Sequence, residues 1–471
     1  MRMIVLSLCT AWLVGCATLP PASQPMVSAE ELRISAAAYS RDGSTLWYVT
    51  GRETCELSAI ALADRSTRSV LRLDWCPTRI SPVDAESFVL TDGVRRGEWK
   101  RSDGTDVVAG SVLAASSATN YVRVDGERLI WVRDSKHRDI GVAGVVTRPT
   151  IVPATGDLFA VIHGDDGEHI ERMTADGASI VGAAFPKIDS FDVAPRGEEL
   201  VFSAIRDGNF DVAIASTDGK KVNWVPSDRA DEVAVTWAPR GNKVSFLIRR
   251  PDTTLVRSVH VPTSFQLTFE TPLEKVRALA WEPRAERLAM ILDGPVVPPH
   301  VDSIEYSGAN RESLVQPGRK LVREPERIAF GAADAILIPP RTVRYGEKVP
   351  LFVTLSDEPL AWDDASRDLD ALGGGMLRLR PGDWAEGAPL AQVVTGFPWA
   401  GADQVVVIVE SFEPASASPV PGAGQTLITT GTKLRRGRFF NESRLPSGGV
   451  MITAETWAGA MEYLKGRFQP K

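Results

Sequence analysis

Histidine, cysteine and positive charge are scarce in this chain, and each scarcity narrows the classes of function. Of 471 residues only 5 are His and 4 are Cys, and 53 Lys and Arg face 60 Asp and Glu, a net charge of -7. This acidic balance argues against nucleic-acid binding, which requires a concentrated basic surface. The apolar fraction of 44% and the charged fraction of 24% are ordinary for a globular protein. They exclude a disordered chain, a coiled coil and a polytopic membrane protein.

The N-terminus has the layout of an export signal. Residues 1–15 begin with one basic residue, Arg2, and continue in an apolar run too short to span a bilayer, which is typical of a secretory signal peptide. Residues 13–16, Leu-Val-Gly-Cys, resemble the bacterial lipobox, in which the cysteine is acylated and becomes the new N-terminus. We therefore expect a signal peptide at 1–15, lipidation of Cys16 and a Pro- and Ser-rich tether over 16–29.

The same resemblance implies a location. Ala17, and not Asp, follows Cys16, which favours a lipid anchor in the outer membrane of the bacterial cell envelope, facing the periplasm. The alternative is a soluble secreted protein in which Cys16 carries no lipid.

The cysteines of the mature chain predict a disulfide. Cys9 leaves with the signal peptide and Cys16 carries lipid, so Cys55 and Cys76 remain, 21 residues apart. Two thiols in an oxidising compartment most often pair. The alternative is two unpaired buried thiols. A metal site built on these two residues is not expected, because no His or third Cys lies near them in the sequence.

Residues 30–316 contain an internal repeat. Its clearest copies are turns at 194–197 (Ala-Pro-Arg-Gly), 238–241 (Ala-Pro-Arg-Gly) and 282–285 (Glu-Pro-Arg-Ala), whose prolines at 195, 239 and 283 stand 44 residues apart. An apolar strand follows each turn, and Asp-Gly pairs supply the positive φ that tight hairpins need. A unit of about 40–45 residues with four antiparallel strands is a β-propeller blade. Six or seven blades are therefore expected over 30–316.

The repeat resembles the WD40-like repeat of the TolB family and of the propellers in prolyl oligopeptidase-type enzymes. Their pattern is S-P-D-G, an apolar strand, S-x-R-x-G-N-x-D, a second strand and D-G. Residues 194–197, 203–211 and 218–219 match it here. The resemblance implies a propeller that binds its partner at the rim or at the mouth of the central channel. Four tryptophans in or beside strands are expected in the blade core: Trp47, Trp131, Trp237 and Trp281.

Residues 317–471 change to alternating strands and helices. Strands are expected at 349–355, 376–379 and 404–409, and helices at 363–372, 388–395 and 455–468. Strands that alternate with helices predict a parallel sheet covered by helices. The last helix is expected to pack on the sheet through Trp457, Met461, Leu464 and Phe468. The predicted fold class is mainly β: a six- or seven-bladed propeller with a smaller C-terminal α/β domain.

This order resembles the start of the α/β-hydrolase domain in prolyl oligopeptidase-type peptidases. In that family His-Gly-Gly follows an early strand, and a later strand leads into Gly-x-Ser-x-Gly. The matching segments here are 354–358, without those glycines, and 409–413, Val-Glu-Ser-Phe-Glu, with Ser411 in the place of the nucleophile. A serine nucleophile needs a base, almost always His, and an acid that orients it. All five His (137, 163, 169, 260 and 300) precede this segment, and no Asp follows Asp403.

These observations favour a membrane-anchored envelope lipoprotein that binds a protein, peptide or glycan through its propeller, with a degenerate hydrolase-like domain and no cofactor. The alternatives are a divergent prolyl oligopeptidase-like serine hydrolase that uses Ser411 and, from the TolB resemblance, an assembly factor for envelope complexes. His163, Asp165, Asp166 and His169 have the residue types of a metal site. They fall on a turn between two predicted strands, so no metal site is expected.

Overall fold

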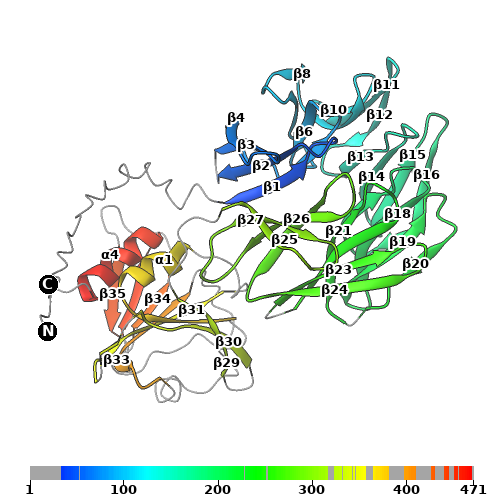
Figure 1. Ribbon diagram of the computed structural model, residues 1–471. Helices are drawn as coiled ribbons and strands as arrows, with labels where there is room; N and C mark the ends of the chain where they lie inside the picture. Colours follow the sequence, from blue (N-terminus) through cyan, green and yellow to red (C-terminus); the bar gives the residue numbers. More distant parts are fainter. Residues whose placement is uncertain are drawn as a thin grey trace, which may run out of the picture.

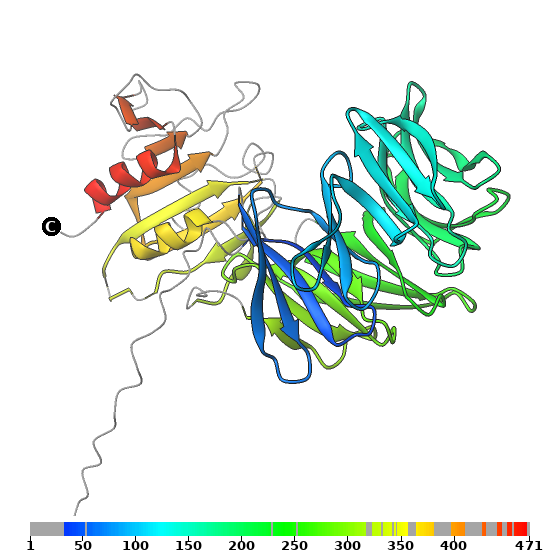
Figure 2. The ribbon, with the colours of Figure 1, turned by 90° about the horizontal axis from the view of Figure 1, so that it is seen from above.

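The computed structural model describes residues 33–51, 54–227, 229–250, 253–316, 323–330, 333–341, 343–344, 346–356, 364–380, 397–409, 426–429, 440–444, 450–454 and 456–468. These residues form two regions, a propeller and an α/β domain, which lie side by side (Figure 1 and Figure 2). Cys16, Ser411 and the helix expected at 388–395 lie outside the described residues.

Each blade of the propeller consists of four consecutive antiparallel strands, paired in chain order. The first three blades are β1 (Ile34–Tyr39), β2 (Thr45–Gly51), β3 (Cys55–Ala61), β4 (Thr67–Leu73); β5 (Arg79–Pro82), β6 (Ser87–Thr91), β7 (Gly97–Arg101), β8 (Asp106–Val108); and β9 (Val112–Ser117), β10 (Asn120–Asp125), β11 (Arg128–Arg133), β12 (Lys136–Val142). The fourth and fifth are β13 (Val146–Ile151), β14 (Leu158–Gly164), β15 (Gly167–Met173), β16 (Ala178–Phe185); and β17 (Ile188–Val193), β18 (Glu199–Arg206), β19 (Asn209–Ser216), β20 (Val222–Trp224). The last two are β21 (Asp231–Trp237), β22 (Lys243–Arg249), β23 (Thr253–His260), β24 (Phe265–Pro272); and β25 (Lys275–Trp281), β26 (Arg287–Asp293), β27 (His300–Glu305), β28 (Glu312–Val315).

The ring has seven blades, which decides between the six and seven expected from the repeat. The first strand of a blade is its inner strand, as contacts between first strands of neighbouring blades show for β1 with β5, β9 with β13, β17 with β21, β21 with β25 and β25 with β1. The four tryptophans predicted in the core are buried, with at most 6% of the side chain exposed, so that prediction is confirmed.

The seam between the seventh and the first blade contains no shared strand. Side chains close it instead: the Tyr39 hydroxyl donates to Ser303 Oγ at 3.2 Å, and Arg65 forms an ion pair with Glu312. A cluster of apolar side chains from both blades fills the seam, including Ile34, Leu46, Ile291, Val301 and Leu314. Ring closure therefore depends on side-chain packing and not on backbone pairing.

The repeat turns and the Asp-Gly hairpins have the expected conformation. Gly197 and Gly241, the last residues of the Ala-Pro-Arg-Gly turns, have φ of 77° and 76°, where L side chains are strained. The β18–β19 hairpin turns at Asp207 and Gly208, both with positive φ, as a two-residue type I′ turn requires. These turns occur in the blades whose limits the repeat predicts correctly, 188–228, 229–273 and 274–316.

The second and third blades differ from the prediction. Blade limits of 74–118 and 119–150 place residues 112–117 at the end of the second blade, whereas β9 (Val112–Ser117) is the inner strand of the third. These blades lack the Pro-Arg-Gly turn that marks the later inner strands. Beside them, Cys55 of β3 and Cys76, which precedes β5, form a disulfide with Cα atoms 5.1 Å apart, tying the first blade to the start of the second.

The α/β domain contains one eight-stranded sheet with the strand order β29-β30-β32-β31-β33-β34-β36-β35. Five neighbouring strands, from β32 to β36 in this order, are parallel, and antiparallel strands flank them at both edges. The expected parallel sheet is thus the centre of a mixed sheet. Its elements are β29 (Glu326–Phe330), β30 (Ala333–Ile338), β31 (Val349–Leu355), α1 (Asp364–Ala371), β32 (Gly375–Leu379), β33 (Ala400–Val409), β34 (Thr426–Thr429), β35 (Phe440–Arg444), β36 (Val450–Ala454) and α4 (Trp457–Phe468).

Helices α1 and α4 cover one face of this sheet (Figure 1). Leu369 of α1 and Met461 and Leu464 of α4 are buried in one cluster with Phe352 and Ile408 of the sheet. Trp457 and Phe468 pack against the same cluster, so the predicted packing of the last helix is confirmed. Among the described residues, no helix is long and apolar enough to cross a membrane.

The two regions touch through the turn between β26 and β27. Val296 in this turn is 7% exposed and packs into the cluster beneath α1 and α4, together with Val297. Strands alternate in direction along a blade, so this turn lies at the end of the ring where the inner strands begin. That end of the propeller therefore faces the α/β domain.

Candidate functional site

The carboxyl edge of the parallel strands is the first candidate, because ligands bind at this edge in open α/β sheets. β31 ends at Leu355, and the Ser356 amide donates to the Leu379 carbonyl at 2.9 Å, which joins the ends of β31 and β32. β33 ends at Val409, two residues before Ser411 in the chain. The sheet thus brings the segment after β33 to this edge, while Ser411 itself lies outside the described residues.

A buried ionic cluster holds the other side of the domain together. Arg323 donates to the carbonyls of Pro339 at 2.6 Å and Gly374 at 2.8 Å, and it pairs with Asp370 near the end of α1 at 2.5 Å. Arg323 is 9% exposed and Asp370 3%. Burial lowers the pKa of Arg323, while the bond to Asp370 raises the pKa of its second partner, Arg341. The cluster joins β30, α1 and β32, so its role is structural.

The five histidines all lie in the propeller. His300 begins β27 beside the interdomain turn and is 4% exposed. Its Nδ1 lies 2.9 Å from the Pro298 carbonyl and therefore carries the hydrogen, and its Nε2 lies 3.7 Å from Asp302 and 4.0 Å from Glu274. Arg311 pairs with both carboxylates. This imidazole is enclosed by groups of its own blade.

The hairpin at 163–169 does not gather its side chains into a metal site. His163 contacts Glu168 through Nδ1 at 2.9 Å and Thr147 through Nε2 at 3.0 Å, while the His169 Nε2 lies 3.9 Å from Glu171. Asp165 and Asp166 form the turn between β14 and β15. Across the part of the chain that the structure describes, no three His, Cys, Asp or Glu side chains are arranged to hold a metal ion.

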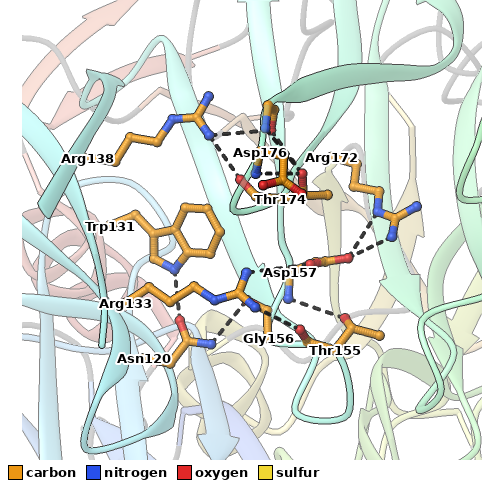
Figure 3. A network of polar contacts seen from close by, with 11 residues as sticks. Asn120, Trp131, Arg133, Arg138, Thr155, Gly156, Asp157, Arg172, Thr174 and Asp176 are labelled. Atoms are coloured by element: carbon orange, nitrogen blue, oxygen red, sulfur yellow. Dashed lines mark hydrogen bonds and ion pairs between the residues drawn. The ribbon is translucent and has the colours of Figure 1, made fainter. Parts of the chain in front are cut away.

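A polar network joins the third, fourth and fifth blades at the end of the ring that faces away from the α/β domain (Figure 3). Asn120 accepts from Trp131 Nε1 at 2.8 Å and donates to the Gly156 carbonyl at 3.1 Å. Asp157 takes two hydrogen bonds from Arg172, at 2.7 and 3.1 Å. Gly156 has a φ of 72°, and a Cβ there would meet the Asn120 amide at 3.1 Å.

The arginines of this network all have partners on adjacent strands or blades. Arg133 donates to the Thr155 carbonyl and Arg138 to those of Thr174 and Gly177, while Arg172 also reaches Thr217 of the fifth blade. Each charge is used within the fold, so the network fixes the angle between blades and leaves no free group for a ligand.

The inner strands carry polar side chains that the sequence analysis did not single out. On β17, Asp189, Ser190 and Asp192 accept the backbone N–H groups of Ala234, Val235 and Trp237 on β21, at 2.9, 3.1 and 2.8 Å. On β5, the half-buried Arg79 reaches Thr150 of β13, and Arg148 stands two residues before Thr150. Three polar residues within the six-residue apolar strand 188–193 were the available signal.

Comparison with known proteins identifies the fold. No family model matches the chain, and no curated protein matches it. A puromycin hydrolase crystal structure aligns with a TM-score of 0.60 at 13% identity, covering 86% of this chain and 79% of that one. Oligopeptidase B from Leishmania major aligns at 0.57 and 12% identity, covering 85% and 71%. Acylaminoacyl peptidase from Pyrococcus horikoshii aligns at 0.54 and 12% identity, covering 84% and 70%. The architecture is therefore that of prolyl oligopeptidase-type proteins, a seven-bladed propeller with an α/β domain.

Proposed function

We propose that this protein binds peptides, with the architecture of a prolyl oligopeptidase-type peptidase, and that Cys16 anchors it by lipid to the bacterial cell envelope. The observation that carries the proposal is the likeness over both regions to solved proteins named as peptidases. A further support is the contact of the interdomain turn at Val296, which places the α/β domain at one end of the propeller ring.

A second candidate is peptide hydrolysis at Ser411. The structural likeness favours it over a role without chemistry, because the similar structures are named as hydrolases and peptidases. The residue chemistry opposes it. Residues 301–471 contain no His, and the imidazole of His300 is 4% exposed and already bonded within its blade. Hydrolysis here would require a base other than the usual histidine. We therefore propose binding as the function and treat hydrolysis as the outcome that would replace it.

Turnover of a peptide library separates the two candidates. The mature protein and its Ser411→Ala variant are incubated with the library, and cleavage is followed by mass spectrometry. Ser416→Ala, five residues away, is the matched control. We expect no cleavage that depends on Ser411, together with peptides retained by the wild-type protein on size exclusion. Cleavage by the wild-type protein and the control, but not by Ser411→Ala, would replace the binding proposal with the hydrolase.

Anchoring is tested by a single substitution. In cells fed labelled palmitate, the wild-type protein is expected to carry label and to sediment with membranes, because two or three acyl chains give stable anchoring. Cys16→Ser is expected to lose both properties, while Cys9→Ser keeps them. An unlabelled, soluble wild-type protein would support secretion without an anchor.

A further inference from the structure

Two arginines in the middle of the propeller differ from those in the network of Figure 3. Arg79 begins the inner strand of the second blade, yet its guanidinium lies 3.5 Å from Thr150 Oγ1 on the inner strand of the fourth. The contact passes the third blade, so the side chain extends across the channel side of β9. A propeller encloses a channel along its inner strands, and Arg79 therefore stands in that channel.

The space around Arg79 is lined by small side chains. Half-exposed positions on the inner strands hold Ala37, Ala115, Ala234, Ala278 and Ala280. Alanine at these positions leaves the channel open where a larger residue would fill it.

Arg79 and Arg148 have no internal counterion. Within the described residues neither guanidinium forms an ion pair, and the single hydrogen bond of Arg79 to a side chain is the long one to Thr150. By contrast, Arg172 in the fourth blade binds Asp157 through two nitrogens. Two unpaired guanidinium groups near each other repel, and an anion between them would remove that repulsion.

Asp192 faces the same space but is already committed. Its carboxylate accepts hydrogen bonds from the amides of Val193 and Trp237 at 2.9 and 2.8 Å and from the Thr236 hydroxyl at 3.4 Å. Burial raises its pKa, which weakens it as a counterion. Burial also lowers the pKa of Arg79; the Asp192 charge acts against this, and the charge of Arg148 adds to it.

We propose that Arg79 and Arg148 form an anion site in the central channel that holds a carboxylate of a bound peptide. A planar guanidinium matches a carboxylate through two parallel hydrogen bonds, and Arg79 keeps most of its donors unused. This inference rests on the proposed peptide binding and adds the group that is recognised. The carboxylate belongs either to the C-terminus of the peptide or to an acidic side chain.

Three fluorescein-labelled pentapeptide pools distinguish these sources by fluorescence anisotropy: random with a free C-terminus, random with a C-terminal amide, and amidated with a central Glu. The wild-type protein is expected to bind the free acid, the Glu pool or both at least about tenfold more tightly than the plain amide, the size of one or two charged hydrogen bonds. Arg79→Met and Arg148→Met, which keep an apolar stem, are expected to abolish this difference. Arg79→Lys should retain part of it, since Lys keeps the charge without the fork.

Arg240→Met, at an exposed turn, is the control and should behave as the wild-type protein. If the wild-type protein binds all three pools equally, peptide binding stands and the anion site is wrong. If it binds no pool, the proposed function fails, and thermal unfolding then tests the site alone. N-acetylalanine, but not its amide, should raise the Tm of the wild-type protein and not that of Arg79→Met. No such rise, or competition by inorganic phosphate alone, would overturn the carboxylate site.

Discussion

The propeller and the α/β domain differ in how far apart in the chain their paired strands lie. In every blade the hydrogen-bonded neighbours are consecutive strands. In the eight-stranded sheet three of the seven neighbouring pairs skip a strand, namely β30 with β32, β31 with β33 and β34 with β36. Pairing of distant segments requires larger loops to close and slows folding. The propeller is thus a sum of local units, while the α/β domain depends on every segment at once.

The two regions also secure their segments in different ways. The α/β domain uses Arg323, a buried side chain that bonds to the ends of β30 and α1 and to the start of β32. The propeller uses a disulfide, seam contacts and turns, each joining strands of one blade or of two adjacent blades. We therefore expect the cost of a lost contact to spread through the α/β domain and to remain local in the propeller.

The largest effect is expected for Asp370→Ala. Removing this carboxylate leaves the buried Arg323 without its counterion, and breaking a buried ion pair in this way costs about 3–5 kcal/mol. Urea unfolding followed by hydrogen exchange should show the whole sheet from β29 to β36 losing protection, while the blades keep theirs.

An exposed ion pair of the propeller provides the control. Asp125→Ala removes the partner of Arg123, and their side chains are 64% and 39% exposed. The loss is expected to stay below about 1 kcal/mol, because solvent screens the pair. Equal losses in the two variants, or loss of protection in the blades of Asp370→Ala, would contradict the proposed difference between the regions.

The second prediction concerns the disulfide. Cys55 and Cys76 enclose 21 residues, and opening a loop of this size costs about 2–4 kcal/mol through the greater freedom of the unfolded chain. The Cys55→Ala/Cys76→Ala variant should therefore lower the unfolding free energy by this amount, with faster exchange in the first two blades and unchanged exchange in the α/β domain. A reducing agent should shift the wild-type protein to the same value and leave the variant unchanged.

The same contrast explains what could be predicted from the sequence. In the fifth, sixth and seventh blades, turns such as 194–197 and 238–241 precede each second strand, so local chemistry marks the limits. In the second and third blades no such turn marks the inner strands, and β9 was assigned to the wrong blade. The elements of the α/β domain were also readable, since β31 and α1 were predicted within a residue of their observed ends. The order of its strands depends on distant pairing that no local pattern records.

The candidate sites follow the same rule. Cys55 and Cys76 form a pair that the cysteine count alone predicted. Arg79 and Arg148 were missed, because they lie 69 residues apart, as their numbers show, and meet only when the second and fourth blades come round the channel. Sequence alternation on an inner strand gives the direction of a side chain but not what it faces across a ring.

The third prediction tests the seam. Tyr39→Phe removes the hydrogen bond to Ser303, while Ser303 keeps its bond to Arg287 at 2.8 Å, so the cost is about 1 kcal/mol. Exchange should rise in the first and seventh blades together. Tyr48→Phe, a buried tyrosine within the first blade, is the control and should affect that blade alone. A rise confined to the first blade in both variants would show that the seam is closed by apolar packing only.

The smallest effect is expected at four turns that occur in the propeller, where an aspartate accepts the amide hydrogen two residues ahead: Asp42, Asp64, Asp103 and Asp218. Hydrogen bonds from neighbouring Ser or Thr hydroxyls and from these amides lower the pKa of each. A lowered folded pKa adds stability that is present above the unfolded value of about 3.9 and is lost as the pH falls through the folded one. The fourfold Asp→Asn variant should therefore be less stable than the wild-type protein at pH 6 and approach it by pH 2. A difference that stays constant over this range would show that the turns stabilise the blades without their charge, since the Asn amide can make the same turn as a protonated Asp.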